Sequence, residues 1–223
     1  TTLAWTFLFG LLWGIGGLTF GLSVRYLGMS LGYGVALGFC AAFGTLIPAI
    51  HDGSILTLLT TASGWVVLSG ILVCLLGIGL CGYAGHLKEV ALTKEEEDKQ
   101  DFHLVRGLLL AGFAGLMSAC MAFGFAAGKP IAESAVASGT DPLWVNNAVL
   151  VVVLLGGFVT NALWCGYLIC SKGSWKDYTD TKAPLVRNFS FAALAGVTWY
   201  LQFMFYGMGS TKMGDYDFTS WTL

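Results

Sequence analysis

The chain has 223 residues, of which 56% are hydrophobic and only 11% are charged. Soluble domains carry about 25% charged residues, so this composition excludes a water-soluble globule of this size and predicts an integral membrane protein. The formal net charge of −2 gives no sign of nucleic acid or of any other strongly charged partner.

Six charge-free stretches are long enough to cross a bilayer, because a helix needs about 20 apolar residues to span the hydrocarbon core. Backbone polar groups in lipid must be paired within their own segment, which favours helices over the short alternating strands of a barrel. We therefore expect an all-α transmembrane bundle. A seventh span is expected to start near Asp217, as in a piece of a longer protein. The six stretches are Leu3–Val24, Tyr26–Ile50, Gly64–Tyr83, Gly107–Gly128, Leu143–Cys170 and Phe189–Ser210.

The basic residues are divided unevenly between the connections. All but Lys129 and Lys212 of the 11 Lys and Arg residues follow the first, third and fifth stretches. By the positive-inside rule these connections are cytoplasmic, so the chain starts on the outer side. Arg25 lies in a very short connection, which makes it a topology anchor or part of an inner gate.

A weak repeat relates the first stretch to the sixth. With an offset of 186 positions, Trp13 aligns with Trp199 and Gly10 with Gly196. An offset of five helices implies a repeat unit of five helices and therefore ten helices in two copies. Because five is odd, the second copy enters the membrane from the opposite side and is inverted. We therefore expect 1–104 to hold the last three helices of one repeat, with a charged cytoplasmic loop at about 86–104. Residues 105–223 then hold the first three helices of the second repeat and the start of the next.

Many glycines lie four residues apart, a spacing that lets helix backbones approach closely in membranes. Static packing is one interpretation, and a bundle whose helices slide or rock is the other. The pairs are Gly10/Gly14, Gly17/Gly21, Gly28/Gly32 and Gly34/Gly38.

The sixth stretch carries a polar and aromatic face. Trp199, Gln202 and Tyr206 are spaced i, i+3 and i+7, so they share one side of a helix, with Tyr200 beside them. Aromatic faces stack on the C–H side of sugars, and Gln and Tyr hydrogen-bond to hydroxyls. The face is therefore a candidate sugar site, opposed by Trp13 of the first stretch. An ordinary helix contact with an aromatic belt is the alternative.

Asn161 lies deep in the apolar fifth stretch. A polar group at this depth is costly and is therefore a candidate for substrate binding. An interhelical hydrogen bond explains it equally well.

Acidic residues near the outer side are candidates for proton coupling, because a desolvated carboxyl group has a raised pKa. Glu133 follows Lys129 by four residues, and Asp215 and Asp217 precede the expected seventh span. Pro130 is expected to break or kink the helix there. A solvated loop with a surface ion pair between Lys129 and Glu133 is the alternative.

No spacing of nucleophiles, bases or metal ligands points to an enzyme, a metal site or a cofactor. The only additional ligand that we expect is the coupling ion, H⁺. The expected partners are a small sugar, the proton and the lipid bilayer.

Several short motifs resemble the L-rhamnose–proton symporter family of the drug/metabolite transporter superfamily, from about Phe9 to the end of the chain. They are Arg25-Tyr-Leu-Gly-Met-Ser30, Leu87-Lys-Glu89, Lys129-Pro130 with Glu133, Asp141-Pro-Leu143, Trp199-Tyr-Leu-Gln-Phe203 with Tyr206, and Asp215-Tyr-Asp217 with Ser220-Trp221.

The resemblance implies a ten-helix protein of the bacterial inner membrane that imports L-rhamnose, or a similar deoxy-sugar, with a proton. The six stretches then correspond to helices three to eight. A metabolite or drug exporter of the same superfamily is the alternative, and a non-transporting membrane receptor or scaffold is another.

Overall fold

The computed structural model describes residues 1–51, 53–91, 103–180 and 182–214, and all regular structure in these ranges is helical. This confirms the all-α class. The α-helices are α1 (Thr2–Leu27), α2 (Met29–His51), α3 (Ile55–Thr60), α4 (Ala62–Ala91), α6 (Leu104–Ser118), α7 (Cys120–Ala137), α8 (Val145–Lys172) and α9 (Leu185–Ser210). Short 3₁₀ helices cover Pro142–Trp144 and Ser174–Thr179. The expected seventh span lies outside the described residues.

Five helical segments in the described ranges are long and apolar enough to cross a membrane. They are Thr2–Leu27, Met29–His51, Ala62–Lys88, Leu104–Ala137 and Pro142–Lys172. These five candidate spans coincide with the first five predicted stretches and support a multi-pass membrane protein. The sixth stretch also forms a helix, the 26-residue α9, but polar residues such as Asn188 and Gln202 lower its hydropathy. Its passage through the bilayer therefore stays a prediction.

The fourth span is interrupted at a place that its sequence does not mark. α6 ends at Ser118 and α7 begins at Cys120, and the backbone N–H of Ala119 bonds to the carbonyl three residues earlier, at Leu116. The expected break at Pro130 is wrong, because α7 continues through that residue. Transmembrane helices tolerate proline where neighbouring groups satisfy the carbonyl that it leaves without a partner.

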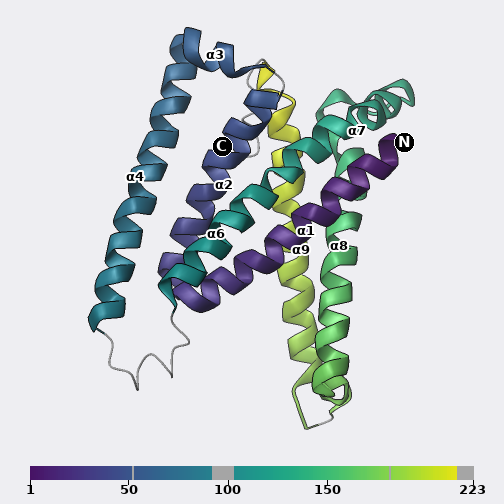
Figure 1. Ribbon diagram of the computed structural model, residues 1–223. Helices are drawn as coiled ribbons and strands as arrows, with labels where there is room; N and C mark the ends of the chain where they lie inside the picture. Colours follow the sequence, from purple (N-terminus) through teal and green to yellow (C-terminus); the bar gives the residue numbers. More distant parts are fainter. Residues whose placement is uncertain (52, 92–102, 181, 215–223) are drawn as a thin grey trace.

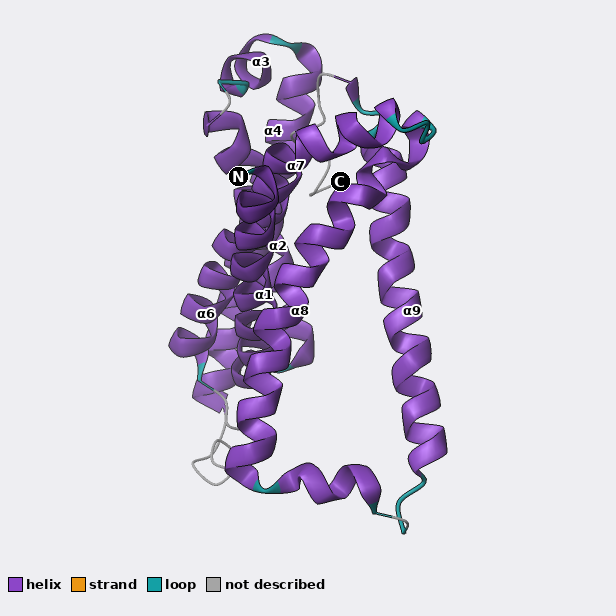
Figure 2. Cartoon of the chain, turned by 90° about the vertical axis from the view of Figure 1, so that its right-hand side faces the viewer, coloured by secondary structure: helices purple, strands orange, loops and turns teal. Residues whose placement is uncertain are grey.

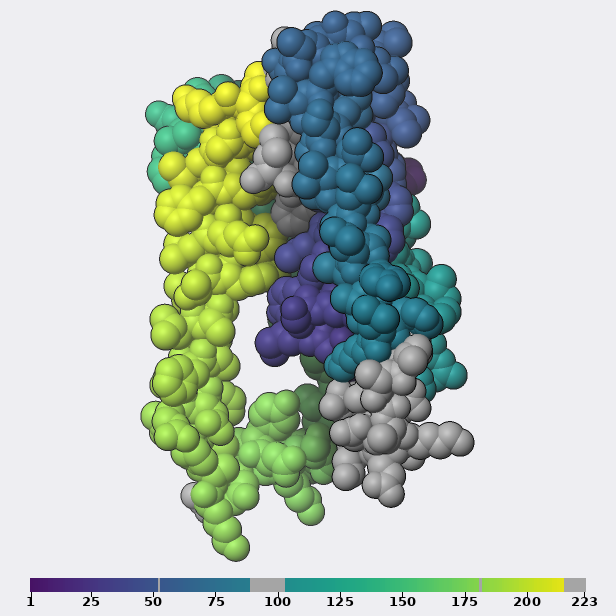
Figure 3. Space-filling model, turned by 90° about the vertical axis from the view of Figure 1, so that its left-hand side faces the viewer, coloured from purple at the N-terminus to yellow at the C-terminus, as the bar shows by residue number. Residues whose placement is uncertain are grey.

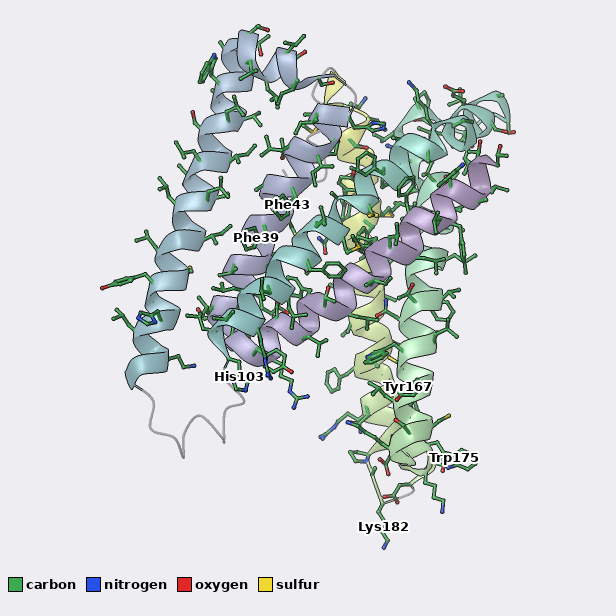
Figure 4. All side chains as sticks on the ribbon, in the orientation of Figure 1. Phe39, Phe43, His103, Tyr167, Trp175 and Lys182 are labelled. Atoms are coloured by element: carbon green, nitrogen blue, oxygen red, sulfur yellow. The ribbon has the colours of Figure 1, made fainter. Side chains whose placement is uncertain are left out.

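The connections alternate between the two ends of the bundle. The C-terminal ends of α1, α4 and α8 point toward the lower end in Figure 1, and those of α2 and α7 point toward the upper end. Figure 4 places His103, Trp175 and Lys182 at the lower end, which we call the basic end. The opposite end is the distal end. The charged loop expected from about residue 86 starts later, because α4 extends to Ala91.

α1 crosses the centre of the bundle, between α6 and α8 (Figure 1). Gly10 and Gly14 pack against α8 so closely that a Cβ on either would meet its backbone. The Thr160 hydroxyl of α8 donates to the carbonyl of Leu11 at 2.9 Å. Static packing therefore explains this glycine pair. It does not explain Gly17, where a Cβ would meet nothing within 4 Å.

Two apolar clusters form the core. Near the basic end, buried residues of α1, α2 and α6 pack together, and toward the distal end residues of α7, α8 and α9 do so. The clusters are Leu27, Val35, Ala36, Leu104 and Ala111, and Met121, Val149, Leu150, Val153 and Phe203. They leave the middle of the bundle, between α1, α2 and α9, less filled.

α9 stands apart from the other helices along much of its length. It approaches α8 near the distal end, and the two separate toward the basic end (Figure 2). The space-filling view in Figure 3 shows an opening between the lower half of α9 and the helices facing it. Val186, near the start of α9, is 82% exposed.

Candidate functional site

A central cavity of about 560 Å³ lies where α1, α2, α6, α8 and α9 meet. This volume is within the range of about 300–1,000 Å³ for small-molecule sites. It is lined near the middle of four helices and at the last residue of α6, by Trp13, Gly17, Phe20, Cys40, Ser118, Asn161, Trp199, Gln202 and Phe203 among others. The cavity therefore sits at about half the depth of the bundle.

Three aromatic rings form one wall of this central cavity. The Trp13 and Trp199 indoles stack at 5.9 Å between centroids, with 19° between their planes. The Phe203 ring meets both edge-on, at 5.5 Å from Trp13 and 4.6 Å from Trp199. The structure thus brings together the two tryptophans that the 186-residue offset relates.

The polar groups of the central cavity come from several helices. Gln202 lines it from α9, the Cys40 thiol from α2 and the Ser118 hydroxyl from the end of α6. The Asn161 amide donates at 2.8 Å to the carbonyl of Gly157, one turn earlier in its own helix. The interhelical bond considered for Asn161 is therefore replaced by an intrahelical one, and the side chain lines the cavity.

Two further cavities continue from the central one along α9. A side cavity of about 800 Å³ shares Cys40, Ser118 and Gln202 with the central cavity and also reaches Tyr206. A distal cavity of about 500 Å³ shares Tyr206 and extends to Ser210. Because these α9 residues are four apart, one polar face of the helix follows all three cavities.

The distal cavity also holds two of the predicted proton-coupling residues, Lys129 and Glu133. They lie one turn apart on α7, whose course through Pro130 places both at the cavity wall. A cation and a carboxylate therefore face the same space at the distal end. Asp215 and Asp217 lie outside the described residues.

A hydrogen-bonded clasp joins α8 to α9 beside the distal cavity. The Asn146 amide donates to the Ser210 hydroxyl at 2.6 Å and to the Gly207 carbonyl at 3.1 Å. One turn closer to the centre, the Tyr206 ring packs edge-on against Phe125 of α7 at 5.3 Å. Asn146 was not predicted as a site residue, because a polar residue near a helix end needs no special explanation.

The remaining predicted residues lie away from these cavities. Tyr200 is 39% exposed and lines none of the central, side or distal cavities. Arg25 lies in the last turn of α1, at the basic end. Ser118 was missed, because a single serine in an apolar run carries no periodic signal.

Membrane-length helices around a solute-sized cavity at mid-depth define the class as a multi-pass membrane protein with an internal cavity. The sequence comparisons then name its family. A model of the L-rhamnose-proton symport protein family matches residues 1–223, and the chain belongs to that family. This confirms the resemblance seen in the motifs. The family description is that of a transporter and not of an enzyme.

Curated relatives agree with this membership. The chain is 41% identical over 229 residues to the L-rhamnose-proton symporter of Citrobacter koseri. It is also 41% identical over 226 residues to that of Yersinia pestis. In both cases the similarity covers the whole chain and 65% of the relative's length. No solved structure matches the chain.

Proposed function

We propose that the protein containing this chain imports L-rhamnose or a similar deoxy-sugar, together with a proton, across the bacterial inner membrane. The observation that carries the proposal is the central cavity, which the stacked indoles and Gln202 line together at mid-depth. The names of the curated relatives support the same solute and coupling ion.

The sugar lies beside the indole pair in this proposal. Trp13 and Trp199 are in direct contact, with centroids 5.9 Å apart, and aromatic pairs touch at about 4.5–7 Å. A pyranose ring therefore does not fit between them. Its C–H face packs on the aromatic wall, while Gln202, Asn161 and Ser118 provide hydrogen bonds to its hydroxyls.

The proton enters through the distal cavity, which the positive-inside rule places on the outer side. Glu133 is the group proposed to carry it, with Lys129 one turn away and Asp215 and Asp217 as further candidates. Protonation and sugar binding together favour an inward-open state, because a ligand shifts a conformational equilibrium only by binding one state better.

The proposal includes two inverted repeats of five helices, with residues 1–104 in the first and 105–223 in the second. Two observations support it. Trp13 and Trp199, which the repeat makes equivalent, are in contact. α1 runs from the distal to the basic end and α9 runs back, so the two helices have opposite directions (Figure 1).

The test uses the full-length protein in proteoliposomes with an imposed proton gradient and labelled L-rhamnose. Trp199→Ala and Gln202→Ala are expected to abolish uptake. Glu133→Gln is expected to keep sugar exchange without a gradient and to lose accumulation. Trp175→Ala is the control, because Trp175 lies in the basic-end connection and is 66% exposed.

Other outcomes identify the alternatives. Outward movement of a hydrophobic solute, without proton entry when sugar is added, would indicate an exporter. Sugar binding to a sealed vesicle without any transfer would indicate a receptor. If Glu133→Gln and Asp217→Asn both still accumulated sugar, the coupling role of these carboxylates would be refuted.

A further inference from the structure

We propose that Gly17 is a specificity-determining position, at which bare backbone sets the size of the solute substituent that the central cavity accepts. This inference rests on the proposed function. It assigns a role to a residue that neither packing nor backbone conformation explains.

Packing gives no reason for a glycine at this position. A Cβ built on Gly17 meets no atom within 4 Å, and the residue is exposed. The neighbouring glycine differs, since a Cβ on Gly16 would lie 2.9 Å from the Cβ of Met117 and 3.3 Å from the Ala114 carbonyl oxygen. Gly16 is therefore required by the contact between α1 and α6, and Gly17 is not.

Backbone conformation gives no reason either. Gly17 lies in the middle of α1 and is not among the glycines with positive φ in the described residues. Any L-residue adopts this conformation, and alanine favours a helix more than glycine does. Gly17 differs from an ordinary helical residue in its position, because a side chain there would occupy part of the central cavity.

The position of Gly17 connects it to the aromatic wall. It follows Trp13 by four residues, so the two share one face of α1. Trp199, Gln202 and Asn161 line the same cavity from α9 and α8. A side chain at position 17 would therefore take space next to the indoles and amides to which the solute is proposed to bind.

The space beside Gly17 can be probed with three sugars of increasing size. L-Lyxose, L-rhamnose and L-mannose share their ring hydroxyls and differ only at C5, which carries hydrogen, methyl or hydroxymethyl. Because each added group needs more room, a smaller cavity excludes L-mannose first, L-rhamnose next and L-lyxose last. One methylene in a tight pocket changes kcat/KM by about 10- to 200-fold.

The experiment compares uptake of the three sugars by the full-length protein and two substitutions at Gly17. Gly17→Ala is expected to lower L-mannose uptake about tenfold relative to L-lyxose, with L-rhamnose between them. Gly17→Leu is expected to abolish uptake of all three. Gly17→Ala should unfold in detergent at no lower temperature than the unsubstituted protein, since the added Cβ meets nothing within 4 Å.

Gly21 supplies the matched control. It lies one turn further along α1, a Cβ there also meets nothing within 4 Å, and it lines none of the central, side or distal cavities. Gly21→Ala and Gly21→Leu are expected to leave the uptake of all three sugars unchanged. Equal losses at both positions, or normal uptake by Gly17→Leu, would overturn the inference.

A second measurement separates this inference from the proposed function. If the unsubstituted protein takes up none of the sugars, the proposed function fails, and alkylation of Cys40 still tests Gly17. Cys40 lines the same cavity, so Gly17→Leu should slow its modification by a maleimide at least fivefold, whereas Gly21→Leu should not. Peptide mass spectrometry reads the rate, and equal rates in the two variants would refute the role of Gly17.

Discussion

Asn146→Ala removes both hydrogen bonds of the clasp between α8 and α9. Interhelical hydrogen bonds in membrane proteins contribute about 0.6 kcal/mol on average and about 1.7 at most. The 2.6 Å bond to Ser210 is short, so it belongs in the upper part of that range. We expect the free energy of unfolding to fall by roughly 1–2 kcal/mol.

A double-mutant cycle with Ser210→Ala isolates the contact between the two side chains. After Asn146→Ala, the Ser210 hydroxyl still donates to the Gly207 carbonyl at 3.1 Å. No buried group of the clasp is then left without a partner. The coupling energy should therefore equal the lost contact, about 1 kcal/mol.

The assay is reversible unfolding of the full-length protein in mixed micelles by titration with a denaturing detergent. Asn147→Ala is a matched control, because the buried Asn147 Oδ1 has no hydrogen-bond partner among the described residues. Its removal should leave stability unchanged or raise it. A coupling energy near zero, or an equal loss in the Asn147 variant, would refute the reasoning.

Three further predictions concern the bundle and its central cavity. Gly156→Ala should destabilise the protein in the same assay by about 1–3 kcal/mol, because its Cβ would meet the Phe7 carbonyl. Gly166→Ala on the same helix should leave stability unchanged, because a Cβ at this position meets nothing within 4 Å. Trp199→Phe should retain partial sugar binding in equilibrium dialysis and Trp199→Ala should retain none, because only the former keeps an aromatic face. Saturating L-rhamnose should slow alkylation of Cys40, as read by mass spectrometry, since the thiol and the sugar share one cavity; an unchanged rate would contradict that placement.

Much of the fold could be predicted because the bilayer restricts what an apolar sequence can form. Each long charge-free stretch became helical, the fourth as the two helices α6 and α7, since lipid offers no partner for unpaired backbone groups. The interruption at Ala119 could not be foreseen, because the sequence there contains no proline, glycine or charge. Pro130 gave the opposite signal, yet α7 passes through it. Sequence rules for where a helix ends are less reliable where neighbouring helices hold a segment in place.

Only the part of the candidate site that a single helix contributes could be predicted from the sequence. Spacing alone placed Trp199 and Gln202 on one face of α9. The far walls come from other helices, so the roles of Ser118 and Asn146 depended on how the bundle packs. Gly17 shows the same limit: its spacing to Gly21 resembles a packing motif, and only the surrounding helices reveal open space there.

The contact between Trp13 and Trp199 also bears on how the transport cycle proceeds. In a molecule with two equivalent halves, moving from one access state to the other exchanges the conformations of the halves. Such an exchange maps this pair of indoles onto itself, so the contact does not have to break. Under the proposed inverted repeat and the proposed function, the two rings would act as a pivot, and a solute resting against them would keep one constant neighbour from entry to release.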